Sequence, residues 1–132
     1  MFRKIVIVLA LFGYLLAACS GQSNSTNTRV GDSTAGKLLF NQGTISSVPG
    51  CIICHSIEAG QVKVGPSLAD IANTAKKRVK GQTGEEYLRA SILDPNAYTV
   101  QGYPTSIMNQ TYKDLLTDSQ VNDLVAYLLT LK

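Results

Sequence analysis

The stretch that decides the fold is PGCIICHSIE, residues 49–58, in which a histidine directly follows the second of two closely spaced cysteines. Cys51, Cys54 and His55 have three possible interpretations: a covalent anchor for haem, half of a zinc site, or a redox dithiol. The C-x-x-C-H pattern is the attachment signature of c-type haem. Its spacing suits that chemistry, because two thiols separated by two residues can reach the two vinyl groups on one edge of a porphyrin.

The rest of the sequence has few residues to complete the other two sites. A structural zinc ion takes four ligands, usually with a second pair of Cys or His. His55 is the only histidine, and Cys19 is the only other cysteine. A thioredoxin-like dithiol is expected near a βαβ pattern, whereas the residues around this motif have helical patterns. The sequence therefore favours covalent haem.

The first residues have the features of an export signal. Arg3 and Lys4 precede an apolar run, residues 5–18, that is shorter than the roughly 20 residues needed to span a bilayer. A basic start and a short apolar core are typical of a secretory signal. The run ends in LAAC, which resembles the lipobox of bacterial lipoprotein precursors. That resemblance implies cleavage before Cys19 and attachment of lipid to it; the alternative is ordinary cleavage that leaves Cys19 unmodified.

A polar segment follows Cys19 and separates it from the folded part. Its sequence, SGQSNSTNTRVGDS, has the composition of a flexible tether. We therefore predict a signal peptide at 1–18, a tether at 19–33 and one domain at 34–132. Roughly one hundred residues is the size of a single domain.

Charge gives little reason to expect a nucleic-acid partner. The chain has 12 Lys and Arg against 9 Asp and Glu, and removal of the signal brings the two nearly into balance. A near-neutral domain has no general attraction for nucleic acid. One basic cluster is present, and we interpret it as a solvated loop or as part of a docking surface for an acidic redox partner: Lys76, Lys77, Arg78 and Lys80.

Helical patterns predict an all-α domain of about four short helices. The first lies near residue 34, with Ser33 or Thr34 as its N-cap, and the second lies within GPSLADIAN, residues 65–73, with Leu68 and Ile71 facing inward. Two further helices begin with capping boxes and carry apolar stripes at helical spacing. Thr83–Glu86 precedes Leu88 and Ile92, and Thr117–Gln120 precedes Val121, Leu124, Val125 and Leu128.

A long segment between the last two helices has no clear period. Residues 96–116 form a loop of a length that is usually functional or wrapped around another group. Four short helices also make a thin core for a domain of this size. A large apolar cofactor would supply the missing core.

In the order of its elements, the sequence from about residue 34 to 132 resembles the class I bacterial cytochromes c. The resemblance rests on Gly36 and Phe40, the Cys51–His55 motif, Gly65-Pro66-Ser67-Leu68, Met108, and Leu124, Tyr127 and Leu128. It implies a small all-α fold around one covalent haem c. It also implies that Gly36, Phe40 and Tyr127 mark the crossing of the first and last helices.

Met108 is the candidate for the second axial ligand of the iron, opposite His55. The only other methionine, Met1, leaves with the signal, and the family places its axial methionine in the corresponding loop. A His/Met pair saturates the iron and favours the reduced state, which suits a carrier better than a catalyst. The alternative is a methionine that only fills a gap in the core. The family often has proline after this methionine, whereas Asn109 follows here.

Further site residues follow from the resemblance. The carbonyl of Pro66 matches the position that accepts the N–H of the iron-bound imidazole; Pro66 could equally be a proline at a helix start. Three tyrosines could contact the cofactor or be ordinary packing residues: Tyr98, Tyr103 and Tyr112.

These expectations define a membrane-tethered electron carrier rather than an enzyme. The resemblance implies partners that oxidise quinol, such as alternative complex III, and acceptors such as a cytochrome c oxidase or a photosynthetic reaction centre. Cys19 would hold the protein by lipid at the outer, periplasmic face of the bacterial cytoplasmic membrane. The alternative function is a haem-based sensor or ligand-binding protein with a labile sixth ligand.

Overall fold

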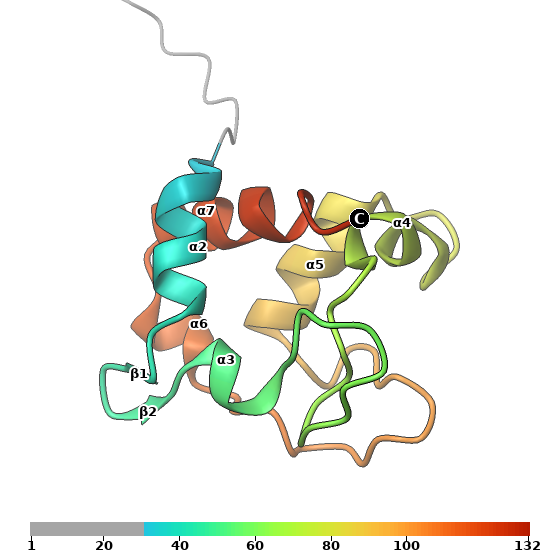
Figure 1. Cartoon of the computed structure of the whole chain (residues 1–132), viewed down its shortest axis with the longest axis horizontal. Helices are drawn as coiled ribbons and strands as arrows, with labels where there is room; N and C mark the ends of the chain where they lie inside the picture. Colours follow the sequence, from blue (N-terminus) through green and yellow to red (C-terminus); the bar gives the residue numbers. More distant parts are fainter. Residues whose placement is uncertain (1–30) are drawn as a thin grey trace, which may run out of the picture.

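In the computed structural model, residues 31–132 are described, and within them short helices are joined by long loops (Figure 1). The predicted signal peptide at 1–18, Cys19 and nearly all of the predicted tether lie outside the described residues. The elements in chain order are α2 (Ser33–Phe40), β1 (Thr44–Ile45), β2 (Val48–Pro49), α3 (Cys51–Cys54), α4 (Ile71–Thr74), the 3-10 turn η1 (Ala75–Lys77), α5 (Gly84–Leu93), α6 (Tyr112–Leu115) and α7 (Asp118–Leu128). Within the described residues no helix is both long and apolar enough to cross a membrane.

The crossing of α2 and α7 organises the fold (Figure 1). At Gly36 a Cβ atom would lie 1.9 Å from the carbonyl oxygen of Asp123, so the two backbones approach more closely than any side chain allows. Beside this contact the rings of Phe40 and Tyr127 pack with their centroids 5.5 Å apart. The crossing predicted at these residues is confirmed.

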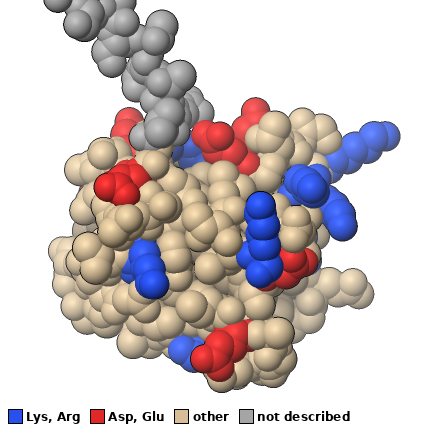
Figure 2. All heavy atoms as spheres, turned by 45° about the horizontal axis from the view of Figure 1, so that its top comes forward, with Lys and Arg blue, Asp and Glu red and all other residues tan. Residues whose placement is uncertain are grey.

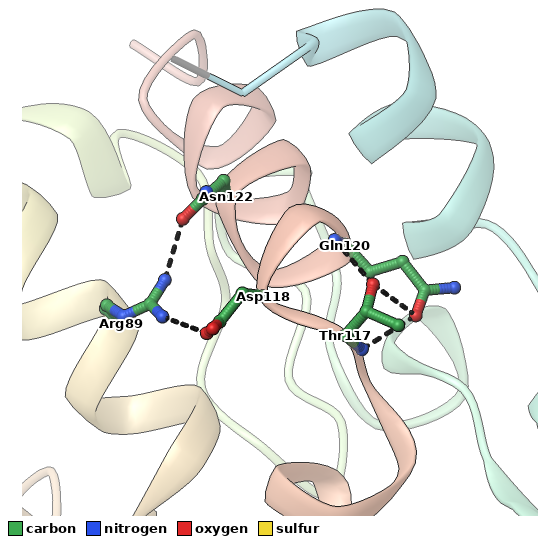
Figure 3. Close-up of polar contacts among 5 residues, drawn as sticks. All are labelled: Arg89, Thr117, Asp118, Gln120 and Asn122. Atoms are coloured by element: carbon green, nitrogen blue, oxygen red, sulfur yellow. Dashed lines mark hydrogen bonds and ion pairs between the residues drawn. The ribbon is translucent and has the colours of Figure 1, made fainter. Parts of the chain in front are cut away.

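Helix α7 also has the start and the buried face that its sequence predicts. Thr117 and Gln120 form a reciprocal capping box, which satisfies backbone N–H groups at the helix start (Figure 3). The four apolar residues of the predicted stripe are all buried: Val121, Leu124, Val125 and Leu128. Burial of each such side chain contributes about 1.5–3 kcal/mol.

Helix α5 follows the same plan and is tied to α7. Thr83 and Glu86 form its capping box, and Leu88 and Ile92 are buried as predicted. On the outer side, Arg89 donates hydrogen bonds to Asp118 at 2.5 Å and to Asn122 at 2.7 Å (Figure 3). Both acceptors belong to α7, so a single guanidinium fixes the relative position of the two helices.

Several local predictions were wrong or incomplete. The N-cap of α2 is Asp32, not Ser33 or Thr34; its carboxylate accepts from the N–H groups of Thr34 and Ala35. Helix α4 begins only at Ile71, after Asp70 with a left-handed φ of 58°, so half-buried Leu68 precedes the helix. The antiparallel hairpin of β1 and β2 was not predicted, and neither were the four-residue helices α3 and α6.

Candidate haem site

A cavity of about 560 Å³ lies at the centre of the domain, and the predicted haem-binding residues meet around it. Its volume is within the range of a few hundred to a thousand cubic ångströms that is typical of ligand sites. Its walls come from nearly every element, so the missing core inferred from the sequence corresponds to this space. The predicted site residues that line it are Cys51, Cys54, His55, Pro66 and Met108.

The two cysteines lie on the single turn of α3, and both are free and half-buried. Burial raises the pKa of the Cys51 thiol to about 11, with a smaller increase from nearby Cys54. The chain just before this turn is anchored from α6, because the hydroxyl of Tyr112 donates to the carbonyl oxygen of Pro49 in β2 at 2.5 Å. Burial also raises the pKa of Tyr112 to about 12, so this hydroxyl keeps its proton at physiological pH.

His55 is held in one orientation by its neighbours in the chain. Its Nδ1 lies 2.8 Å from the carbonyl oxygen of Pro66, which can only accept, so Nδ1 carries the proton and Nε2 keeps its lone pair. Burial lowers the pKa of the ring, and this outweighs the opposite effect of the Pro66 hydrogen bond. The neutral imidazole that results is the form that ligates metals.

The segment that carries Pro66 folds back tightly onto the motif. The N–H of Gly65 donates to the carbonyl of Cys54 at 2.8 Å, and the N–H of Leu68 donates to that of Ser56 at 2.7 Å. Gly65 itself packs against the imidazole: a Cβ there would lie 2.5 Å from Cε1 of His55. Backbone contacts on both sides of Pro66 therefore fix the hydrogen bond that the family resemblance implies.

Met108 is half-buried against the core, in a loop that is fixed on both sides. Before it, Asn96 accepts from the N–H of Ser106 at 2.9 Å. After it, Asn109 Oδ1 accepts from the N–H of Thr111 at 2.7 Å, and Gln110 Nε2 donates to the carbonyl oxygen of Met108 at 2.6 Å. The Asn109 bond closes an Asx turn, so a side-chain hydrogen bond constrains the chain where the family often has proline.

The structure adds Arg78 to the site, which the sequence analysis placed in a solvated cluster. That prediction holds for Lys76, Lys77 and Lys80, which are exposed, but Arg78 is half-buried and lines the cavity. Helical spacing could have predicted the burial of Arg78, because it lies seven residues after buried Ile71 and three after buried Ala75, on the same helical face. The three candidate tyrosines also line the cavity: Tyr98, Tyr103 and Tyr112.

Arg78 provides a direct test of whether haem suits this cavity. Its Nε atom is buried and has no hydrogen-bond partner, and a buried unpaired donor is costly. Haem carries two propionate carboxylates, and a carboxylate is the natural partner of a guanidinium. The thiols, the neutral imidazole and this unpaired donor together fit the group. Within the described residues, no three His, Cys, Asp or Glu side chains are grouped to hold a metal ion, as a zinc site would require.

A model of the cytochrome c family matches residues 33–132, which is most of the chain. The chain belongs to the cytochrome c family. Membership establishes a covalently bound c-type haem, with Cys51 and Cys54 in the attachment motif, and haem-based electron transfer as its general role. No curated protein matches the chain in sequence. The all-α class I cytochrome c fold expected from the sequence is confirmed, with six α-helices among the described residues where about four were predicted.

Arg78→Met should weaken the holoprotein. It removes the charge-assisted pair that Arg78 would form with a haem propionate, worth about 1.5–3 kcal/mol. At roughly 4–8 °C per kcal/mol for a domain of this size, the melting temperature should fall by about 6–24 °C. The reduction potential should also fall, because a positive charge near the iron favours the reduced state. Thermal melts and redox titrations of the haem-loaded protein measure both.

Lys77→Met is the matched control, because it removes the same charge from an exposed neighbour. It should change neither quantity appreciably. Equal effects of the two substitutions would show that Arg78 acts only through net charge.

Proposed function

We propose that this cytochrome c is a one-electron carrier in which His55 and Met108 are the two axial ligands. The observation that carries the proposal is that both residues line the same cavity, with the His55 ring bonded to the carbonyl oxygen of Pro66 and the backbone of Met108 bonded to Gln110. When bound, the haem supplies an iron that cycles between Fe(III) and Fe(II). Met108 is the only methionine of the described residues and supplies a soft, neutral thioether.

A ligand set that does not change between oxidation states suits transfer rather than catalysis. The Pro66 hydrogen bond keeps the proton of the His55 ring on Nδ1, fixes the ring's orientation and leaves Nε2 available as a ligand. The Asx turn at Asn109 limits how far Met108 can move. Since neither residue must be displaced, little rearrangement accompanies the gain or loss of an electron.

The proposal includes attachment to a membrane. The LAAC sequence and the polar residues after it support cleavage before Cys19 and lipidation of that residue. The domain would then move on a short tether at the outer face of the bacterial cytoplasmic membrane, which raises the effective concentration of membrane-bound partners. Suitable donors are quinol-oxidising complexes, including alternative complex III, and suitable acceptors are a cytochrome c oxidase or a photosynthetic reaction centre.

Met108→Ala tests the proposal. The oxidised wild-type protein should show the sulfur-to-iron charge-transfer absorption near the red end of the spectrum, and the variant should lose it. The reduction potential should fall, because the ligand that favours Fe(II) is gone. The reduced variant should bind carbon monoxide readily, whereas the wild type should not. Visible spectroscopy and redox titration give all three readouts.

Gln110→Ala is the control for disturbance of the loop, since it removes a contact to the Met108 carbonyl but no sulfur. It should retain the charge-transfer absorption. A wild-type protein that is high-spin when oxidised and binds carbon monoxide when reduced would instead favour the sensor or ligand-binding function.

A further inference from the structure

The surface around the haem cavity is unusually poor in charge. Residues 38–57 and 95–112 contain no Asp, Glu, Lys or Arg. These two segments include α3 and the Met108 loop, which lie on the same side of the molecule (Figure 1). Arg78, whose Nε is buried, is the one Lys, Arg, Asp or Glu among the described residues that line the cavity.

Charged residues gather elsewhere on the domain. Figure 2 brings forward the end formed by α2, α7 and α4, where acidic and basic side chains are both visible. The exposed lysines of the basic cluster, Lys76, Lys77 and Lys80, lie at and just after η1. Most charged residues therefore lie away from the two uncharged segments, whereas Glu58 and Lys63 lie in the segment that packs next to α3.

Exposed apolar side chains lie in the uncharged segments and in the short segment that follows α3. Five large apolar side chains of residues 31–132 are more than half exposed, and four of them lie near the cavity: Ile53 (52%), Val62 (82%), Val64 (58%) and Ile107 (53%). We call these four the apolar rim. The fifth, Leu38, is on α2.

Contacts in the structure bring the members of the apolar rim together. Lys63 Nζ donates to the carbonyl oxygen of Ile52 at 2.7 Å, which holds the segment with Val62 and Val64 against α3 and Ile53. Val64 and Ile107 both line the cavity and are both exposed, so they lie at its mouth. The Lys63 ammonium group is therefore hydrogen-bonded to the backbone of α3.

We propose that the apolar rim is the docking surface for a redox protein whose own docking surface is uncharged and apolar. The inference rests on the proposed carrier function, because a carrier must bring its cofactor close to that of its partner. An acidic partner would find no row of cations at the cavity mouth, and the lysines that could attract it lie outside the apolar rim. Electrostatic complementarity therefore favours a partner whose docking surface is not surrounded by charged residues.

A membrane surface fits the apolar rim less well than a protein does. Segments that lie on membranes combine apolar residues with Trp or Phe and with several Lys or Arg at the boundary. The apolar rim has no aromatic member, and its single neighbouring cation, Lys63, is bonded to the backbone of α3. Small, weak interfaces are in contrast usual between electron-transfer proteins.

Electron self-exchange between two copies of the protein is a direct test, because each copy presents an uncharged apolar surface to the other. The probe is the haem-loaded full chain carrying Cys19→Ser, so that lipid does not bring copies together in one micelle. Mixtures of its oxidised and reduced forms give the exchange rate from NMR line broadening. Between about 0.02 and 0.5 M salt the exchange rate should change less than about twofold, because salt screens exposed charges and the apolar rim has none.

Ile107→Glu should slow exchange about fivefold at low salt, because two carboxylates then meet in the encounter, and high salt should restore most of the rate. Val62→Glu should act in the same direction. Leu38→Glu adds the same charge on α2 and should leave the rate unchanged. The visible spectra of Val62→Glu and Leu38→Glu should match that of the parent, because neither residue lines the cavity, and a match shows that the haem site is intact.

If the copies instead docked through the lysine cluster, the salt dependence of the rate and the effects of the variants would differ from those above, and the inference would be overturned. The parent rate would then rise steeply with salt, Lys77→Glu would accelerate exchange, and Ile107→Glu would have no effect. Binding of the Cys19→Ser protein to phosphatidylcholine vesicles, abolished by Ile107→Glu, would assign the apolar rim to the membrane and also overturn it. Failure of the carrier function itself is distinct: the parent would not cycle reversibly between oxidised and reduced forms.

Discussion

Gly65→Ala should displace the imidazole of His55 and so damage the haem site with a single methyl group. The new Cβ would lie 2.5 Å from Cε1, 2.8 Å from Nδ1 and 3.0 Å from Nε2 of the ring. The ring cannot move aside without losing its hydrogen bond to Pro66, and Gly65 is itself bonded to Cys54. We expect severalfold less haem-loaded protein, and a visible spectrum that shows weakened axial ligation in the fraction that is loaded.

Gly43→Ala is the matched control, because a Cβ at Gly43 meets nothing within 4 Å and its φ is not left-handed. It should leave the yield and the spectrum unchanged. Haem staining on denaturing gels measures covalent loading, and absorption spectra report the ligand field. If Gly65→Ala loaded haem normally and had the wild-type spectrum, the described packing of Gly65 on His55 would be wrong.

Gly36→Ala should strongly destabilise the fold. Its Cβ would lie 1.9 Å from the carbonyl oxygen and 2.5 Å from the carbonyl carbon of Asp123, and 2.9 Å from Cβ of Tyr127. No rotamer change relieves a clash with backbone, so α2 and α7 must separate. Overpacking usually costs about 1–3 kcal/mol and occasionally more, and a 1.9 Å approach to a backbone oxygen puts this clash at or above the top of that range. The cost therefore exceeds the gain of about 1 kcal/mol in helix propensity.

Denaturant unfolding of the holoprotein, followed by far-ultraviolet circular dichroism, measures this effect. We expect a net loss of about 2 kcal/mol or more, because the clash outweighs the gain in propensity. Gly43→Ala again serves as the control and should be neutral or slightly stabilising, since it restricts only the unfolded chain. A Gly36→Ala variant as stable as wild type would mean that the two helices can separate at no cost.

The parts of the fold that could be predicted are those specified by neighbouring residues. The start of α7 and its buried face follow from Thr117, Gln120 and the stripe from Val121 onward, because a capping box and a helical period are local. The start of α5 follows from Thr83 and Glu86 for the same reason. The two-residue strands of the hairpin have no period that a sequence could reveal.

For the site, the sequence indicated which residues would bind haem, but it did not indicate which other side chains would be buried around it. The spacing of Cys51, Cys54 and His55 indicated haem by itself, and scarcity of other soft donors indicated Met108. Arg78 was missed because its burial depends on how η1 packs in three dimensions, although its helical register with Ile71 was visible. The N-cap at Asp32 was missed because three adjacent residues can all cap a helix, and only the backbone path decides among them.

The α2–α7 crossing also has a consequence for how the protein matures. The N–H of Asp32 donates to the carboxylate of Asp123 at 2.7 Å, across 91 positions of the chain. Contacts at such separation are slow to form, because a long loop must close first. Until α7 packs, Leu124 and Leu128 are missing from the wall of the cavity that the two cysteines also line. We therefore expect the last helix to complete the wall of the haem cavity late in folding.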